Sequence, residues 1–322
     1  MRAYWIVLVL LFLGLSASKG LYDRAVEMTC WAGGYSQDAF MAYCNTDRYG
    51  VYDTEAIWNR VEPGAAQKIQ AAKVLTLSDS HLQNALSLGG ASEWFVKRGV
   101  PFYMLGVPHN ESGFGEKLLE NLNPHPQLLV LDASPFFTGE VGQYERGIFS
   151  DPKGSLRGVE DLKKYQVWHE RICSELPAAC GHNFAYFRSR SDGHWIFPPQ
   201  TRSIWIGYRD VPNDSLRFPT GELPDVEISS QFPQYLRAAH EFATRLNVPP
   251  ACVVITNVPS NYELRDLAAT LGKELGWTVV DPKVSGLFTF DKSHLTPESS
   301  VRWTDEFLKE LDPVISRCVN GG

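Results

Sequence analysis

The sequence has little of what marks a nucleic-acid-binding protein. Its 30 Lys and Arg residues are outnumbered by 37 Asp and Glu residues, which gives a net charge of -7 at pH 7. It contains no basic run, no low-complexity tract and no internal repeat. Because binding to a phosphate backbone requires a basic surface, we expect no nucleic-acid partner.

Long hydrophobic runs are also missing, with one exception at the N-terminus. Arg2 precedes an apolar run from Tyr4 to Leu15, and mostly small residues follow up to Gly20. This layout is typical of a secretory signal peptide over residues 1–20. The run is shorter than the roughly 20 residues that cross a bilayer, which favours cleavage over the alternative, a retained anchor. The sequence therefore predicts an exported protein, periplasmic or secreted, with membrane contact only through an uncleaved N-terminal segment.

Zinc-type cysteine spacing is absent as well, and no metal or organic cofactor is predicted. The chain has 6 cysteines, an even number that fits disulfide bonds in an exported protein. Proximity favours pairing of Cys30 with Cys44 and of Cys173 with Cys180. Cys252 lies in a strongly apolar segment, where a buried thiol is an equally simple interpretation.

Apolar segments alternate with helical patterns from residue 73 onward. We expect strands at 74–77, 101–105, 127–131, 252–256 and 277–280, and helices at 82–97, 115–122, 262–275 and 297–311. Thr296 followed by Pro297 is a typical helix start. This alternation predicts an α/β fold in which helices cover both faces of a parallel sheet.

Residues 135–228 interrupt this alternation, and we interpret them as an insertion between the third and fourth core strands. A helix at 158–175 precedes an aromatic stretch that includes Phe184, Tyr186, Phe187, Trp195, Phe197, Trp205 and Tyr208. These aromatics form either a lid or substrate wall, or a packing surface against the core. Residues 21–70 are predicted to be an N-terminal extension, and residues 71–316 the main domain.

The first segment with chemical potential is Ser78-Asp79-Ser80-His81, between the first strand and the following helix. Ligands bind at the carboxyl ends of parallel strands, and a helix N-terminus stabilises a developing anion. Ser80 is therefore a candidate nucleophile, with Asp79 and His81 as candidate substrate contacts. An ordinary helix cap is the alternative, because Asp and Ser are preferred capping residues.

The second segment is Asp291-Lys292-Ser293-His294, between the last strand and the last helix. An aspartate three residues before a histidine can bind one ring nitrogen, which leaves the other to take a proton from a serine. Alone, such a segment is more typical of a turn with an exposed histidine. Together, the two segments predict Ser80 as nucleophile, His294 as base and Asp291 as the residue that orients it.

The two segments resemble the SGNH, or GDSL, hydrolase superfamily, in which a Gly-Asp-Ser block ends the first strand and an Asp-x-x-His block precedes the last helix. The resemblance covers residues 73–134 and 251–312, with Ser78 in place of the family's glycine. The sequence Asp79-Ser80-His81 most resembles that of SGNH domains linked to polysaccharide O-acetylation. The resemblance implies a three-layer α/β/α sandwich with a flavodoxin-like parallel sheet, and the same three catalytic roles.

The oxyanion hole of that family is only partly recognisable. The resemblance implies donors from Ser80 and from Gly106, which follows the second strand. The family's asparagine after the third strand is missing, and Ser134 and Asn110 are the alternative donors. His109, in the same loop as Asn110, is a further candidate substrate contact or simply a polar loop residue.

These features predict an exported serine esterase or O-acetyltransferase that forms an acyl-serine intermediate. Its expected substrate is a small-molecule or polysaccharide acyl ester, and the export signal and aromatic insertion favour a carbohydrate. The alternative is a non-catalytic SGNH-like protein that binds a glycan or a partner in a polysaccharide acylation system. A third interpretation is a protein that assists a membrane acyltransferase partner.

Overall fold

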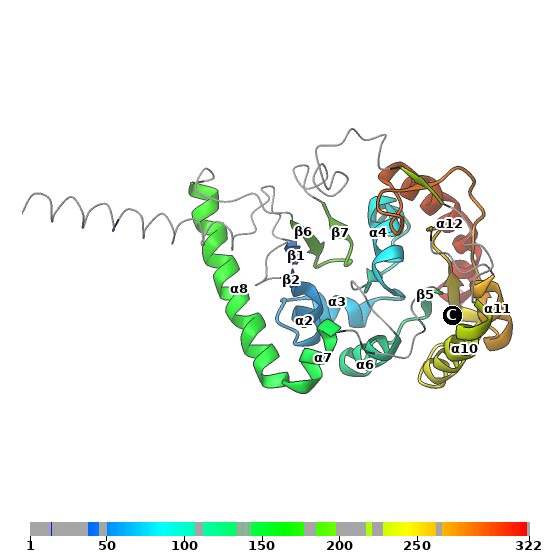
Figure 1. The fold of residues 1–322 in the computed structure, drawn as a ribbon, viewed down its shortest axis with the longest axis horizontal. Coiled ribbons are helices and arrows are strands. Elements are labelled where there is room, and N and C mark those ends of the chain that lie inside the picture. The colour runs from blue at the N-terminus through cyan, green and yellow to red at the C-terminus, as the bar shows by residue number, and fades with distance from the viewer. Residues whose placement is uncertain are drawn as a thin grey trace, which may run out of the picture.

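A computed structural model describes residue 14 and residues 38–44, 50–106, 112–133, 137, 141, 143–176, 185–197, 217–220, 228–261 and 266–320. Its centre is a five-stranded sheet between two layers of helices, the predicted three-layer α/β/α sandwich (Figure 1). The five strands are β3 (Val74–Leu77), β4 (Phe102–Met104), β5 (Leu128–Asp132), β9 (Val253–Thr256) and β10 (Thr278–Val279).

The order of these strands explains where a site can form. They run β10-β9-β5-β3-β4, and all four neighbouring pairs are parallel. If the five strands are numbered from first to fifth along the chain, their spatial order is 2-1-3-4-5, which is the flavodoxin-like order. In this order the connections change direction between β3 and β5. Ligands bind beyond the carboxyl ends of the strands at such a point. The residues that follow Leu77 and Leu131 therefore meet at the position where chemistry is expected.

The strands alternate their side chains between two hydrophobic cores. Every residue of β3 and β5 is buried, as expected for central parallel strands. One face packs on α4 (Ser80–Leu88), α5 (Ala91–Arg98) and α12 (Pro297–Cys318). The other packs on α3 (Ala65–Ala71), α6 (Ser112–Leu122), α10 (Ile228–Thr244) and α11 (Leu267–Leu275).

The predicted helix at 82–97 is two helices, α4 and α5, which separate at Gly89 and Gly90. Gly90 has φ +77°, a conformation that glycine adopts without strain. A Cβ at Gly89 would lie 2.1 Å from Oγ1 of Thr304, because α12 packs directly on the end of α4. The prediction of one helix was wrong because this close approach comes from a segment more than 200 residues away.

The N-terminal extension and the insertion share a second, antiparallel sheet. Its order is β2 (Gly50–Val51), β1 (Ala39–Cys44), β6 (Ala185–Ser189) and β7 (Trp195–Ile196). The helices α2 (Tyr52–Trp58), α7 (Gln143–Ser150) and α8 (Pro152–Glu175) lie on this side of the molecule, and α12 lies on the opposite side (Figure 1). A short antiparallel pair, β8 (Phe218–Pro219) with β11 (Phe288–Thr289), and the 3-10 turn η3 (Pro250–Cys252) complete the described elements.

The described aromatic residues of the insertion contribute to packing. Tyr186, Trp195 and Phe197 form a small buried cluster, and Phe187 belongs to the main core. Of the two interpretations of this aromatic stretch, these four side chains fit packing against the fold. Phe184, Trp205 and Tyr208 lie outside the described residues.

Cys252 is bonded to Cys318, so its interpretation as a buried thiol was wrong. The disulfide joins the residue before β9 to the last residue of α12 across a sequence separation of 66. Cys44 and Cys173 are also disulfide-bonded. Their predicted partners, Cys30 and Cys180, lie outside the described residues.

None of the helices in the described ranges has the length and apolar character required to span a membrane. Apart from Gly14, the apolar run at 4–15 that predicts export lies outside these ranges.

Candidate active site

Ser80 is the first residue of α4, directly after the turn that follows β3. Asp79 caps this helix, because its Oδ1 accepts a hydrogen bond from the His81 backbone N–H at 2.8 Å. The Ser78 hydroxyl donates to the Asp79 carbonyl at 3.1 Å and is fully buried. The cap therefore fixes the Ser80 hydroxyl at the carboxyl edge of the sheet, beside the N-terminal amides of α4.

A tight loop holds His294 over this edge. The Oδ1 of Asp291 accepts hydrogen bonds from the backbone N–H of Ser293 at 2.9 Å and of His294 at 2.7 Å. The Phe290 N–H donates to the His294 carbonyl at 3.0 Å, which closes the loop. Lys292 has φ 71°, an uncommon conformation for a residue with a side chain. The aspartate therefore shapes the loop as well as facing the histidine ring.

The structure brings the predicted catalytic residues into one hydrogen-bonded chain. Nδ1 of His294 lies 2.7 Å from Oδ2 of Asp291, and Nε2 lies 2.8 Å from Oγ of Ser80. Burial alone would raise the pKa of Asp291, but the hydrogen bond and charge of His294 outweigh it and hold the pKa below 3.8. An ionised Asp291 favours the proton on Nδ1, so that the lone pair of Nε2 faces the serine hydroxyl.

A second set of the same three residue types lies against the first and was missed by the sequence analysis. Nδ1 of His81 lies 2.9 Å from Oδ2 of Asp79, and its Nε2 is hydrogen-bonded to Oγ of Ser293. The rings of His81 and His294 stack with their centroids 5.1 Å apart. The dipeptides Ser80-His81 and Ser293-His294 are therefore cross-paired, because each histidine contacts the serine of the other. The second set could have been predicted, because both segments that were expected to meet contain a Ser-His dipeptide.

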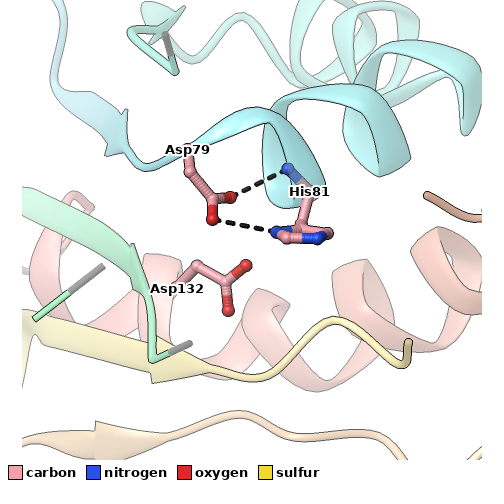
Figure 2. Close-up of side chains that lie close together, drawn as sticks. All are labelled: Asp79, His81 and Asp132. Atoms are coloured by element: carbon pink, nitrogen blue, oxygen red, sulfur yellow. Dashed lines mark hydrogen bonds and ion pairs between the residues drawn. The ribbon is translucent and has the colours of Figure 1, made fainter. Parts of the chain in front are cut away.

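His81 lies among carboxylates (Figure 2). Burial lowers the pKa of the ring, but the charges of Asp79, Asp132 and Asp291 and the hydrogen bond to Asp79 raise it to about 9. At neutral pH the ring is therefore an imidazolium that donates from both nitrogens. A ring without a free lone pair cannot take a proton from Ser293. The two serines consequently differ, because the raised pKa of His81 favours the protonated form of the ring beside Ser293.

Asp79, His81 and Asp132 also form the group with metal-ligand character in the described residues. One ligand atom from each lies within 4.8 Å of the others. Imidazole and carboxylate ligands suit several divalent transition metals. However, both ring nitrogens of His81 are hydrogen-bonded, one to Asp79 and one to Ser293. We therefore interpret the group as a charge-compensated cluster in which His81 is the cation.

Gly106 is engaged on both sides of its peptide unit. Its N–H donates to Oε1 of Gln83 at 2.8 Å, and its carbonyl accepts from Nη2 of Arg188. A Cβ here would lie 2.5 Å from the Cβ of Gln83 and 2.9 Å from Oγ of Ser78. The predicted use of this N–H in an oxyanion hole therefore requires Gln83 to release it.

Of the remaining predicted site residues, some are described by the structure and others are not. Asp79, predicted to contact substrate, is turned toward His81 with a side chain that is 4% exposed. Ser80 is the predicted oxyanion donor that the structure places at the N-terminus of α4. Asn110 and Ser134, the alternative donors, and His109, a predicted substrate contact, lie outside the described residues.

Comparison of the chain with protein-family models, with curated proteins and with solved structures finds no match.

Proposed function

We propose that the protein is a serine esterase or O-acyltransferase that acts on acyl esters, with Ser80 as nucleophile. The observation that supports this most is the chain of contacts from Asp291 through His294 to Ser80, with distances of 2.7 Å and 2.8 Å. It lies at the switch point of a flavodoxin-like sheet and at the N-terminus of α4. This position and geometry are those that nucleophilic serine catalysis requires.

The proposed reaction begins when Ser80 Oγ attacks the ester carbonyl while Nε2 of His294 takes its proton. The resulting imidazolium is stabilised by Asp291 and gives that proton to the departing alcohol. An acyl-serine remains, and water or a second alcohol attacks it while Nε2 takes the attacking hydroxyl's proton. That proton then passes to Ser80 Oγ as the bond from Oγ to the acyl group breaks, which releases the acid or the new ester. The amides at the start of α4 favour the negative charge on the carbonyl oxygen. Water as acceptor makes the protein an esterase, and a sugar hydroxyl makes it an O-acetyltransferase.

The substrate class rests on the sequence. The predicted export signal and the resemblance to SGNH domains linked to polysaccharide O-acetylation favour an acyl ester of a carbohydrate. The same interpretation includes a membrane acyltransferase as partner. The buried positions of Tyr186, Trp195 and Phe197 give no added support for a sugar-binding wall.

One observation favours a second candidate, a non-catalytic module that binds a glycan or partner. The Gly106 N–H, a predicted donor of the oxyanion hole, already donates its hydrogen bond to the side chain of Gln83. Loss of one such donor typically costs about 10²- to 10³-fold in rate. A binding protein tolerates this arrangement, whereas an enzyme needs a substitute donor or a shift of Gln83.

Replacement of Ser80 by alanine tests the proposal. We expect Ser80→Ala to lower hydrolysis of p-nitrophenyl acetate to the uncatalysed rate, because it removes the hydroxyl that lies 2.8 Å from Nε2 of His294. Ser150→Ala, at an exposed position that ends α7, is the matched control and should retain full activity. Thermal unfolding checks that both variants fold. Equal turnover by wild type and Ser80→Ala would contradict the nucleophile assignment, and an inert wild type would favour the binding module.

A further inference from the structure

The proposed reaction leaves His81 without a role, although it occupies the centre of the site. Its side chain is 16% exposed, and it forms polar contacts to both segments that build the site. One contact, to Asp79, lies within the β3–α4 turn, and the other, to Ser293, crosses to the loop that carries His294. His81 is thus a direct side-chain link between the nucleophile's segment and the base's segment.

Two nearly parallel rings lie beside the His294 ring. The centroid of Phe290 lies 5.7 Å away at an interplanar angle of 16°, and that of His81 lies 5.1 Å away at 22°. The hydrogen bond that Nδ1 of His294 donates to Asp291 fixes one edge of the catalytic ring but does not by itself fix its plane. Stacked neighbours restrict the tilt, and the tilt decides whether Nε2 points at Ser80 Oγ.

We propose that His81 is a positioning residue for the proposed reaction. Its ring stacks on His294, and its Nε2–H donates to Ser293, the residue before the base, so that both the plane of the base and the position of its loop are fixed. This inference rests on the proposed function. It assigns no proton transfer to His81 and no nucleophilic role to Ser293.

The charges around His81 support a donor role on both nitrogens. Asp79 from the α4 cap, Asp132 from the end of β5 and Asp291 from the His294 loop all favour the protonated ring. A protonated ring presents an N–H to Ser293 without a choice of tautomer. The cross-link between the two segments is therefore maintained across the neutral pH range.

The test uses the full chain and p-nitrophenyl acetate. Ser293→Ala removes the acceptor, and His81→Phe keeps a flat ring but removes both donors. Each change should lower kcat about 10- to 100-fold and leave KM within about twofold, because misplacement of a catalytic group affects the reaction more than binding. Ser293→Thr restores a hydroxyl and should recover most of the activity. The double variant should be no worse than His81→Phe alone, because both changes remove the same hydrogen bond.

His194→Phe is the matched control. His194 follows Asp192 by two residues, and its Nδ1 lies 2.6 Å from Oδ1 of that aspartate, so it repeats the local arrangement of Asp79 and His81. It lies in the turn before β7 rather than in the site, and its loss should leave kcat unchanged. Thermal unfolding of every variant separates misfolding from misplacement.

A second measurement does not depend on activity. In ¹⁵N-resolved NMR spectra at pH 7.5, both ring nitrogens of His81 should carry protons. A neutral His81 ring would overturn the inference, and so would wild-type kcat in both Ser293→Ala and His81→Phe. In either case, a wild type that is active and depends on Ser80 would still support the proposed function. An inert wild type with a doubly protonated His81 would overturn the function and leave the cross-link supported.

Discussion

In the proposed reaction, Asp291 determines whether His294 can act as a base, because it favours the proton on the far ring nitrogen, Nδ1. Asn at this position keeps the shape of the side chain but can donate to Nδ1, which favours the wrong tautomer. We expect Asp291→Asn to lower kcat on the order of 10²- to 10⁴-fold with little change in KM. Asp305→Asn, at an exposed position in α12, should have no such effect.

The pH dependence follows from the direction of the pKa shift. The pKa of Asp291 lies below 3.8 in the folded protein, so its interaction with His294 is complete above that value and is lost only as the pH falls through the lower, folded pKa. Loss of activity between pH 5 and 7 must therefore arise from another group. Steady-state rates from pH 4.5 to 8.5 test this, and a wild-type profile identical to that of Asp291→Asn would show that the carboxylate does not act on His294.

The segment directly after β4 requires a glycine at position 106, two residues beyond the end of the strand. Gln83 and Ser78 leave no space for a Cβ at this position. Gln83 lies on α4, which is held in place by its buried face, including Ala85. We expect Gly106→Ala to lower the free energy of unfolding by about 1–3 kcal/mol, the usual cost of overpacking.

Gly158→Ala is the control for that substitution. A Cβ at Gly158, inside α8, meets nothing within 4 Å, so the change should stabilise the helix by about 0.5–1 kcal/mol. Urea unfolding of both variants measures the two effects. Equal stability of Gly106→Ala and wild type would show that the contact among Gly106, Gln83 and Ser78 relaxes at no cost.

At the level of elements, local pattern predicted the sheet well because β3, β4, β5 and β9 are short and fully buried runs of mainly apolar residues. It predicted α12 to begin at Pro297, which is correct, since Thr296 caps it through the Ser299 N–H at 3.4 Å. It did not predict that α12 continues through Pro313 to Cys318. Packing of this helix against the sheet and the disulfide to Cys252 outweigh the proline, and neither is visible in a local window.

At the level of the whole molecule, the buried Arg188 links the antiparallel sheet both to helix α2 and to the parallel sheet. Nε of Arg188, on β6, donates to Oδ2 of Asp53 at 2.8 Å, and its Nη1 donates to the Met104 carbonyl at the end of β4 at 2.8 Å. Both charged side chains are 0% exposed. The antiparallel sheet is therefore fastened to the edge of the parallel sheet, next to the turn that holds Gly106.

Such long-range pairings mark the limit of the sequence analysis. The contact among Ser80, His294 and Asp291 was predictable because each residue follows a recognisable strand or precedes a recognisable helix. The pairing of β1 with β6 joins residues about 145 positions apart, and nothing in either strand specifies the other. Likewise, the hydrogen bond from Gly106 to Gln83 depends on how α4 and β4 pack, so the engaged amide could not be inferred from the loop.

The proposal that Ser80, and not Ser293, is the nucleophile can be tested directly in the intact protein. Both hydroxyls are hydrogen-bonded to Nε2 of a histidine, but the carboxylates around His81 raise its pKa and favour the protonated form of the ring beside Ser293. After reaction with a fluorophosphonate probe, peptide mass spectrometry should locate the modification on Ser80, and Ser80→Ala should abolish it. Modification of Ser293 with Ser80 untouched would contradict the account, because it would make His81 the base.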